Sequence, residues 1–484
     1  MKKVLVIILG AGFAYRLLFL GKRQLWTDEL MQALVARESS PEGMLARLQG
    51  GIVLPSPLDF LIQKGVVLVL GESPWALRLH AVLLGTLSLW IFFRIAQRLF
   101  GRRTALYATV LLALFPLHYH YSQEGRPYAL FLFLTLICYE LLLRKIMAEG
   151  AGWSDWAVLG IALALLLYTS FLGILVMLSQ VAGLAASLIL GSRITAARTR
   201  VILEGEKPDL PSARLSQVAQ YCCVAAAACL LFVPWARLAW QAPLAAAGLE
   251  RLSPRILLRI VKEIGDNSYP MTALLLLGGV TGVRALLRHG RRQALAWLAA
   301  WFGVSFPCLF LFELLTEYPF AVHQILHCTP PLILLAGYGL SYAGERFTIL
   351  DQQPYRASSP ALLYAGALLI LSLSIARSHW SKELADWRGT AKALEAITRP
   401  GDELAMPEVS DLLEYHAPSL ANFAAADLDP APGSLRSADV SRRIVVCYDG
   451  MTPDPCSRFR PAAARDRNWT KLEFRGFSVF LRQK

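Results

Sequence analysis

Long apolar runs separated by short polar stretches dominate this chain. Each run approaches the roughly 20 residues that a helix requires to cross a bilayer. We place about eleven such segments, near residues 4–20, 77–97, 104–119, 127–143, 156–169, 171–190, 219–238, 269–287, 294–312, 324–342 and 361–378. The fifth and sixth segments could form one broken unit, because only a short Tyr-Thr-Ser sequence separates them. The pattern predicts an all-α polytopic membrane domain over residues 1–378.

Basic residues between the runs predict the orientation. If the N-terminus is cytoplasmic, one side of the membrane receives Lys2, Lys3, Arg98, Arg102, Arg103, Arg144, Lys145, Arg193, Arg198, Arg200, Arg284, Arg288, Arg291 and Arg292. An odd number of spans then places the C-terminus outside. The first 20 residues have the basic and apolar regions of a signal peptide, but many apolar runs follow them. We therefore expect an uncleaved first span in an inner (plasma) membrane protein.

Two outward regions have patterns of their own. Residues 21–76 contain short amphipathic pieces at 31–38 and 57–71, which we expect along the membrane interface. From residue 379 the composition becomes charged and mixed, with an amphipathic helix stopped by Pro400 and Gly401. Strand-like alternation follows in the last fifty residues. The pattern predicts a small extracytoplasmic α/β domain over residues 379–484.

Composition supports the membrane class. Hydrophobic residues make up 55% of the 484 residues and charged residues only 17%, too apolar for one soluble core. The formal net charge of +13 comes mostly from the stretches between apolar runs, so we expect membrane lipids and no nucleic acid as partners. Six of the eight cysteines lie in apolar runs. The other two, Cys447 and Cys456, could close a small disulfide loop if they face an oxidising compartment.

The first outward loop carries two adjacent acids. Residues 25–30 read Leu-Trp-Thr-Asp-Glu-Leu, directly after a span. Asp28 and Glu29 are costly to hold close together at a membrane surface, and they indicate an acid/base or ion-binding task. The alternative is that Trp26 lies in the interfacial aromatic belt and the acids are solvated loop charges. Taken alone, the segment favours the alternative.

A second polar cluster joins the third and fourth spans on the same outer face. It runs from His118 to Leu130 and contains more charged and aromatic residues than a tight connection requires. Pro127 fits the first turn of the next helix, which leaves Glu124 and Arg126 at the positive end of that helix. Arg126 can form a fork to a phosphate oxygen there. The alternative is an internal ion pair between Glu124 and Arg126 that anchors the loop.

Four different short motifs follow one another along the first part of the chain. They are Asp-Glu at 28–29, Ser-Pro-Trp-Ala-Leu-Arg at 73–78, Phe-Gly-Arg-Arg at 100–103, and Tyr-Ser-Gln-Glu-Gly-Arg-Pro-Tyr-Ala-Leu at 121–130. Together they resemble bacterial members of the protein-mannosyltransferase and aminoarabinose-transferase superfamily (family 39-like), including the RgtA/B/C/D-like lipopolysaccharide-core glycosyltransferases. The resemblance covers residues 1–180, and beyond them it is architectural. It implies a GT-C fold of about 11 transmembrane helices.

The resemblance also implies an activity. These enzymes move a sugar from a polyprenyl-phosphate donor to an acceptor on the extracytoplasmic face, with inversion of the anomeric centre. By position, Asp28 is the expected catalytic base. Glu29 and Glu124 would orient the acceptor or assist the base, while Arg126 and Arg78 would meet the phosphate. For Arg78 the alternative is simple snorkelling at a helix end.

The remaining candidate substrate-binding residues are a tyrosine and a histidine. Tyr128 could stack on a sugar ring or donate a hydrogen bond to it. The Arg-Tyr of the family near the tenth span is replaced by His323-Gln324, and His323 has either a phosphate or acceptor role or a packing role. The family's Pro-Pro-Leu-Tyr in the first loop reads Pro-Ser-Pro-Leu-Asp at residues 55–59. If the missing arginine normally holds the phosphate, another cation must do so here.

Cofactor and partner expectations follow from the same residues. A divalent metal ion bridged by Asp28, Glu124 and either His118 or His120 is conceivable, although no ligand spacing is diagnostic. The donor partner is a polyprenyl-phosphate sugar, and the acceptor is a lipid, a glycan or a protein. Two alternatives stay open, a transporter or flippase for a lipid-linked sugar and a catalytically inactive family member. Polar residues gathered at the outer surface, rather than at mid-membrane, favour the enzyme.

Overall fold

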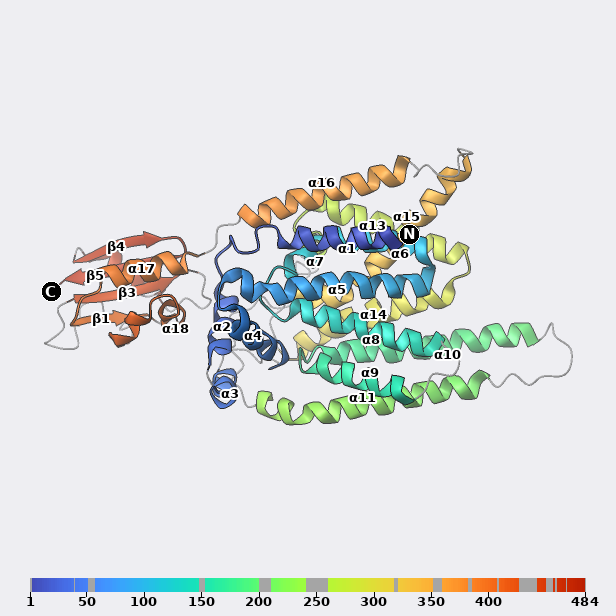
Figure 1. The fold of residues 1–484 in the computed structure, drawn as a ribbon, viewed down its shortest axis with the longest axis horizontal. Coiled ribbons are helices and arrows are strands. Elements are labelled where there is room, and N and C mark those ends of the chain that lie inside the picture. Colours follow the sequence, from blue (N-terminus) through green and yellow to red (C-terminus); the bar gives the residue numbers. More distant parts are fainter. Residues whose placement is uncertain are drawn as a thin grey trace.

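The chain forms a helical bundle and a separate small sheet at one end of it (Figure 1). The computed structural model describes residues 2–38, 40–50, 57–147, 153–199, 210–240, 260–316, 321–350, 359–381, 385–406, 409–425, 442–449, 456–457, 459–466 and 468–483. The N-terminal end of the first helix lies at the end of the bundle away from the sheet. The predicted boundary between two domains at residues 378 and 379 stays a prediction.

Long helices run side by side along the bundle, and shorter helices connect them. They are α1 (Lys2–Leu17), α5 (Pro74–Phe100), α6 (Arg102–Leu114), α7 (Pro116–Tyr121), α8 (Tyr128–Met147), α9 (Trp153–Leu167), α10 (Gly173–Thr199), α11 (Leu210–Trp240), α13 (Tyr269–Arg288), α14 (Arg292–Thr316), the 3-10 helix η1 (Val322–Cys328), α15 (Pro330–Leu350) and α16 (Ser359–Ser381). Within the described residues, α5, α10, α11, α13 and α14 contain stretches long and apolar enough to cross a membrane. The mostly helical fold is therefore confirmed, and the count of eleven spans stays a prediction.

The apolar segment at 104–119 is not one straight helix. Helix α6 ends at Leu114, and α7 begins at Pro116 after an extended Phe115 with φ −67° and ψ 117°. Proline has no N–H to donate, and it disfavours the helical conformation in the residue before it. This break turns the chain toward the polar residues 118–126.

Three short helices, α2 (Thr27–Arg37), α3 (Pro41–Gly50) and α4 (Pro57–Leu70), occupy the bundle end nearest the sheet (Figure 1). Helices α2 and α4 coincide with the amphipathic pieces predicted at 31–38 and 57–71, whereas α3 was not predicted. Leu25, Leu30 and Ala33 share one buried apolar cluster with Trp387 and Leu394 of the C-terminal part. Burial of this apolar surface packs α2 between the bundle and the sheet.

The C-terminal part contains the predicted helix and strands. Its elements are α17 (Trp387–Ile397), β1 (Asp402–Ala405), α18 (Ser410–Glu414), η2 (Pro418–Asn422), β2 (Ala424–Ala425), β3 (Arg442–Tyr448), α19 (Phe459–Arg465), β4 (Trp469–Phe474) and β5 (Phe477–Gln483). The sheet order is β2-β1-β3-β5-β4, with β1 parallel to β2 and β3 and the other pairs antiparallel. Gly476, with φ 78°, makes the turn of the β4–β5 hairpin.

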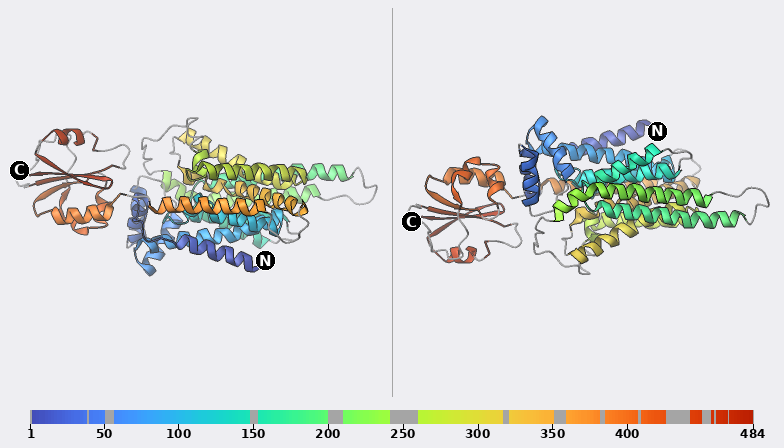
Figure 2. Two further views of the ribbon diagram at one scale, coloured as in Figure 1. Left: turned by 90° about the horizontal axis from the view of Figure 1, so that it is seen from above. Right: turned by 90° about the horizontal axis from the view of Figure 1, so that it is seen from below.

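The sheet is covered on both faces. Figure 2 shows it edge-on, with α17 on one side and α19 on the other. Ile444 and Val446 of β3 pack with α17, while Val445 and Cys447 pack with α19. Successive strand residues point to opposite faces, so the continuous apolar run of β3 serves both layers.

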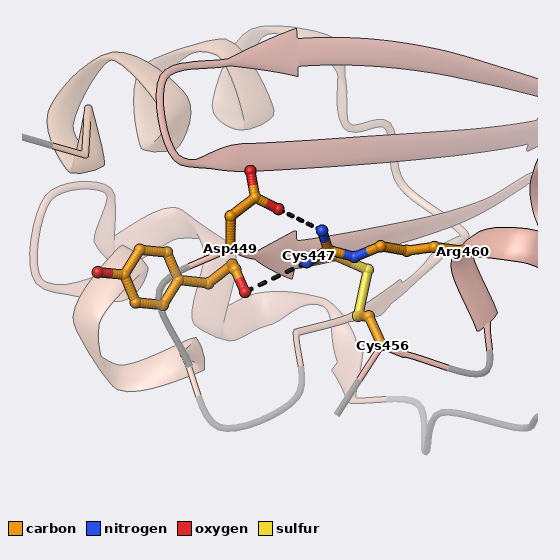
Figure 3. Close-up of a disulfide and its surroundings, with 5 residues drawn as sticks. Cys447, Asp449, Cys456 and Arg460 are labelled. Carbon is orange, nitrogen blue, oxygen red and sulfur yellow. Dashed lines mark hydrogen bonds and ion pairs between the residues drawn. A yellow bond between two sulfur atoms is a disulfide. The ribbon is translucent and has the colours of Figure 1, made fainter. Parts of the chain in front are cut away.

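A disulfide joins Cys447 of β3 to Cys456, and both residues are buried (Figure 3). Their Cα atoms lie 5.9 Å apart, and the sequence separation is 9 residues. Beside the disulfide, Arg460 forms an ion pair with Asp449 and donates to the Tyr448 carbonyl oxygen. The sequence left open whether Cys447 and Cys456 form a disulfide, and in the structure they do.

A buried carboxylate, Glu140, lies in the second half of α8. Glu140 of α8 accepts from the Arg94 Nε at 2.9 Å and from the Arg98 Nη2 at 2.9 Å. The two arginines lie one helical turn apart on α5, so one carboxylate joins both to α8. Glu140→Gln is therefore a suitable control for substitutions at other buried carboxylates.

Candidate active site

The two acids that follow α1 have different surroundings. Both lie in the first turn of α2, where successive side chains are about 100° apart around the helix axis. The side chain of Asp28 is 39% exposed, whereas that of Glu29 is 1% exposed. Glu29 accepts from the Trp26 N–H at 3.3 Å, which caps the start of the helix. Only Asp28 therefore faces open space.

Glu29 forms a buried ion pair with Arg78 of α5. The distances are 2.8 Å from the Arg78 Nε to the Glu29 Oε1 and 2.6 Å from its Nη2 to the Glu29 Oε2. The other three N–H groups of Arg78 donate to the carbonyl oxygens of Leu20, Arg23 and Gln24 at 2.8–3.0 Å. All five donors of this guanidinium are thus engaged within the protein.

The same carboxylate holds the turn after α7. The Gly125 N–H donates to the Glu29 Oε1 at 2.8 Å. A Cβ at position 125 would lie 3.0 Å from the Leu77 carbonyl oxygen, so the close approach favours glycine here. The two predicted polar segments therefore meet at Glu29.

Arg126 extends from this turn toward the start of α2. Its Nη1 donates to the Gln32 Oε1 at 3.1 Å and to the Asp28 carbonyl oxygen at 3.3 Å. Its Nη2 lies 3.7 Å from the Asp28 Oδ2. The Arg126 Nε is buried and has no hydrogen-bond partner among the described residues. Arg126 consequently retains donor capacity beside an exposed carboxylate.

The acids also differ in pKa. Burial raises the pKa of Asp28, with Glu124 and Glu29 adding to the rise and Arg126 opposing it. Burial acts in the same direction on Glu29, but the Arg78 ion pair outweighs it and lowers the pKa of that carboxyl. Glu29 is therefore held as a carboxylate, while Asp28 has the more basic carboxylate of the two.

Aromatic rings line the other side of Arg126. Its guanidinium carbon lies 5.9 Å from the ring centre of Tyr128, and that ring stacks on His323 at 4.2 Å. Burial and the nearby Arg126 lower the pKa of His323 to about 3. The imidazole is therefore neutral near pH 7, and it does not supply the positive charge of the family's missing arginine.

Glu124 lies on the turn between α7 and α8. Its Oε1 is 2.9 Å from the His120 Nε2, and its buried Oε2 has no hydrogen-bond partner in the described part of the chain. Arg23 interacts electrostatically with this carboxylate. Arg23 was not predicted as a site residue, although its place five residues before Asp28 could have indicated it.

The four candidate metal ligands do not gather. The His118 Nδ1 lies 2.7 Å from the Nη2 of Arg16, a buried cation of α1, so a cationic group occupies one ring nitrogen. Within the described residues, no group of three or more His, Cys, Asp or Glu side chains is placed to hold a metal ion. The predicted set of Asp28, Glu124 and either His118 or His120 therefore has no support in this geometry.

The bundle of apolar helices and the small C-terminal sheet describe a multi-pass membrane protein. The sequence profile of the dolichyl-phosphate-mannose-protein mannosyltransferase family matches residues 55–203. ArnT from Cupriavidus metallidurans in the apo state is similar in structure, with a TM-score of 0.62 and 14% identity over 98% of this chain and 97% of that chain. The structure of the same protein bound to undecaprenyl phosphate gives a TM-score of 0.61 and 14% identity over the same shares.

An archaeal protein shares the fold more distantly. The oligosaccharyltransferase AglB from Archaeoglobus fulgidus, in complex with an inhibitory peptide and a dolichol-phosphate, gives a TM-score of 0.56 and 11% identity over 92% of this chain and 69% of that chain. No curated protein sequence matches this chain significantly. The GT-C resemblance predicted from the motifs is confirmed. At identities this low, the structural similarity shows a shared fold and not a shared activity.

Proposed function

We propose that this protein is a membrane glycosyltransferase that moves a sugar from a polyprenyl-phosphate donor to an acceptor hydroxyl on the extracytoplasmic face. The observation that carries the proposal is the pairing of a partly exposed carboxylate, Asp28, with an under-satisfied guanidinium, Arg126. The known structures with this fold that hold undecaprenyl phosphate or a dolichol-phosphate support a lipid phosphate as the donor group.

The reaction assigned to these groups is a single displacement. The Asp28 carboxylate takes the proton of the acceptor hydroxyl, and the oxygen attacks the anomeric carbon from the face opposite the phosphate. The bond from the anomeric carbon to the phosphate oxygen breaks, and its electron pair leaves with the polyprenyl phosphate. Arg126 donates to the phosphate oxygens as their charge develops. The product sugar has inverted anomeric configuration.

Other predicted residues receive positioning roles. Because every N–H of Arg78 is engaged, we assign Glu29 and Arg78 to holding the first loop and the turn at Gly125 in place. Tyr128 presents a ring to the sugar or to Arg126, and His323 supports that ring by stacking. Glu124, whose Oε1 lies 2.9 Å from the His120 Nε2, is assigned to orienting the acceptor.

The test is transfer by the purified full-length chain. Wild-type protein in nanodiscs, given a labelled polyprenyl-phosphate sugar and a cell-envelope extract as acceptor source, should release free polyprenyl phosphate and label an acceptor. Asp28→Asn should abolish labelling, whereas Glu72→Gln, an exposed carboxylate paired with Arg37, should retain it.

Three outcomes would contradict the proposal. Transfer by Asp28→Asn at the wild-type rate would remove the assigned base. Movement of the labelled donor across proteoliposomes without transfer would identify a flippase. Binding of the donor with neither transfer nor movement would identify an inactive family member.

A further inference from the structure

Asp59 is a fully buried carboxylate that the reaction described above does not use. It lies in the first turn of α4 with 0% of its side chain exposed. The position corresponds to the tyrosine of the family's Pro-Pro-Leu-Tyr, so a charge stands where an aromatic ring is expected. A buried carboxylate is costly unless its partners compensate, so its contacts indicate what it does.

A chain of hydrogen bonds leads from Asp59 to Arg126. The Gln32 Nε2 donates to the Asp59 Oδ2, and the Gln32 Oε1 accepts from the Arg126 Nη1 at 3.1 Å. Behind Asp59, the His80 Nε2 lies 3.3 Å from the other carboxylate oxygen. Gln32 is also fully buried, so the chain is shielded from water along its length. Sequence separations of 27 and 94 residues divide its members.

The chemistry of an amide gives this chain a direction. A glutamine has a donor end and an acceptor end, a carboxylate only accepts, and a guanidinium only donates. Asp59 must face the NH₂ end of Gln32, and this turns the carbonyl end toward Arg126. An uncharged residue at position 59 would remove that constraint.

We propose that Asp59, acting through Gln32, is a positioning residue that holds Arg126 in its phosphate-binding orientation and apart from the Asp28 carboxylate. This inference rests on the proposed function. The Nη1 of Arg126 is engaged by Gln32 and by the Asp28 main chain, and the guanidinium also interacts with Tyr128, which leaves the Nη2 beside Asp28 as the donor group for a ligand. The hydrogen bonds from Asp59 through Gln32 maintain the distance of 3.7 Å between the Arg126 Nη2 and the Asp28 Oδ2.

Loss of the hydrogen bonds between Asp59, Gln32 and Arg126 has a defined chemical consequence. A released Arg126 can close the gap and form a tighter ion pair with Asp28, which occupies the phosphate donors and makes the base weaker. The charged groups that interact with Asp28 are Arg126, Glu124 and Glu29, and only Arg126 is held by Gln32. A shift in the titration of Asp28 therefore reports on Arg126.

The test uses two single variants and their combination. Asp59→Asn and Gln32→Leu should each lower kcat by roughly tenfold to a hundredfold, because a displaced catalytic group loses that much. Both should shift the acid limb of the pH–rate profile to lower pH. The double variant Gln32→Glu/Asp59→Asn restores the order of donors and acceptors, so it should recover most of the lost rate and the wild-type limb.

Glu140→Gln is the matched control, because it also removes a buried carboxylate from a double contact. It should lower thermal stability without moving the acid limb. Binding of undecaprenyl phosphate gives a readout that needs no transfer: Asp59→Asn should weaken it relative to wild type and Glu140→Gln should not.

Two results would overturn the inference and leave the proposed function intact. One is an unchanged acid limb and unchanged carrier binding in Asp59→Asn. The other is a double variant no better than its parents although it remains folded. Failure of the proposed function would instead be seen in the wild-type chain, as an absence of transfer.

Discussion

Asp28 and Glu29 are neighbours in the sequence and differ in almost every physical respect. Glu29 is buried in an ion pair with Arg78, whereas Asp28 is partly exposed beside Arg126. The sequence predicted that this acid pair matters, but not which member is free to react. Burial is set by the residues that surround each side chain, and these come from distant parts of the chain.

The raised pKa of Asp28 predicts a pH profile. A carboxyl with a raised pKa takes up its proton at a higher pH, so the rate should fall as pH drops through a value above the ordinary ~3.9 of aspartate. The measurement is kcat/KM for transfer between about pH 3 and 8, a range that includes the ordinary pKa of aspartate. A limb at or below the ordinary aspartate value, or an identical limb in the residual activity of Asp28→Asn, would contradict the assignment.

Arg126→Lys tests the geometry of phosphate binding. Lysine keeps the charge but loses the planar fork and the hydrogen bond to Gln32, so we expect a rate lower by roughly a hundredfold, as when one transition-state donor is removed. The measurement is kcat and donor KM with labelled donor. Arg144→Lys, in the ion pair between α8 and α9, is the control and should behave as wild type. Equal rates for the two variants would exclude Arg126 from the reaction.

At the scale of elements, the Glu29–Arg78 pair holds together the segment after α1, α2, α5 and the turn before α8. Removing one partner of a buried ion pair leaves the other charge unpaired. Glu29→Gln should therefore destabilise the protein by about 3–5 kcal/mol, as is typical for a broken buried pair. Glu72→Gln breaks an exposed pair with Arg37 and should cost about 0–1 kcal/mol.

Thermal unfolding in detergent, followed by tryptophan fluorescence, measures this difference. Similar midpoints for Glu29→Gln and Glu72→Gln would show that the buried pair does not hold these elements. The prediction is independent of activity, because it concerns only how the loop and the turn are fixed.

Predicted elements agree with the fold where local pattern decides them. The strands β3, β4 and β5 and the helix α17 follow from alternation and from capping by Asp386, which accepts from the Gly389 N–H. The split of the 104–119 segment at Pro116 was not predicted, although proline chemistry could have indicated it. Local interactions suffice for these features because they involve residues only a few positions apart.

At the scale of the whole molecule, the C-terminal part packs on the loop that follows α1. Gln24 donates to the Asp386 carboxylate at 2.9 Å, and the Thr27 hydroxyl lies 3.1 Å from that of Tyr448. The sheet is therefore close to the helix that carries Asp28. The sequence predicted a C-terminal domain but gave no indication of where it would dock.

The disulfide makes the orientation testable. If the sheet is extracytoplasmic, Cys447 and Cys456 should be oxidised in cells. In a variant with the other six cysteines replaced, a membrane-impermeant maleimide on intact spheroplasts should then label these two buried positions only after reduction in urea, which opens the C-terminal part. Replacing both with serine should destabilise the C-terminal part by about 2–4 kcal/mol, measured by limited proteolysis. Labelling only after the membrane is permeabilised would reverse the orientation.

The sequence by itself determined the apolar runs, the mixed composition of the tail and the polar segments at 25–30 and 118–130, because hydropathy and strand alternation are properties of neighbouring residues. Only the tertiary structure decided which side chains in those segments meet. Glu29 finds Arg78 across 49 positions and Gly125 across 96, and Arg126 finds Gln32 across 94. Contacts of this kind form when helices pack, and no local pattern encodes which face each helix presents to its neighbours.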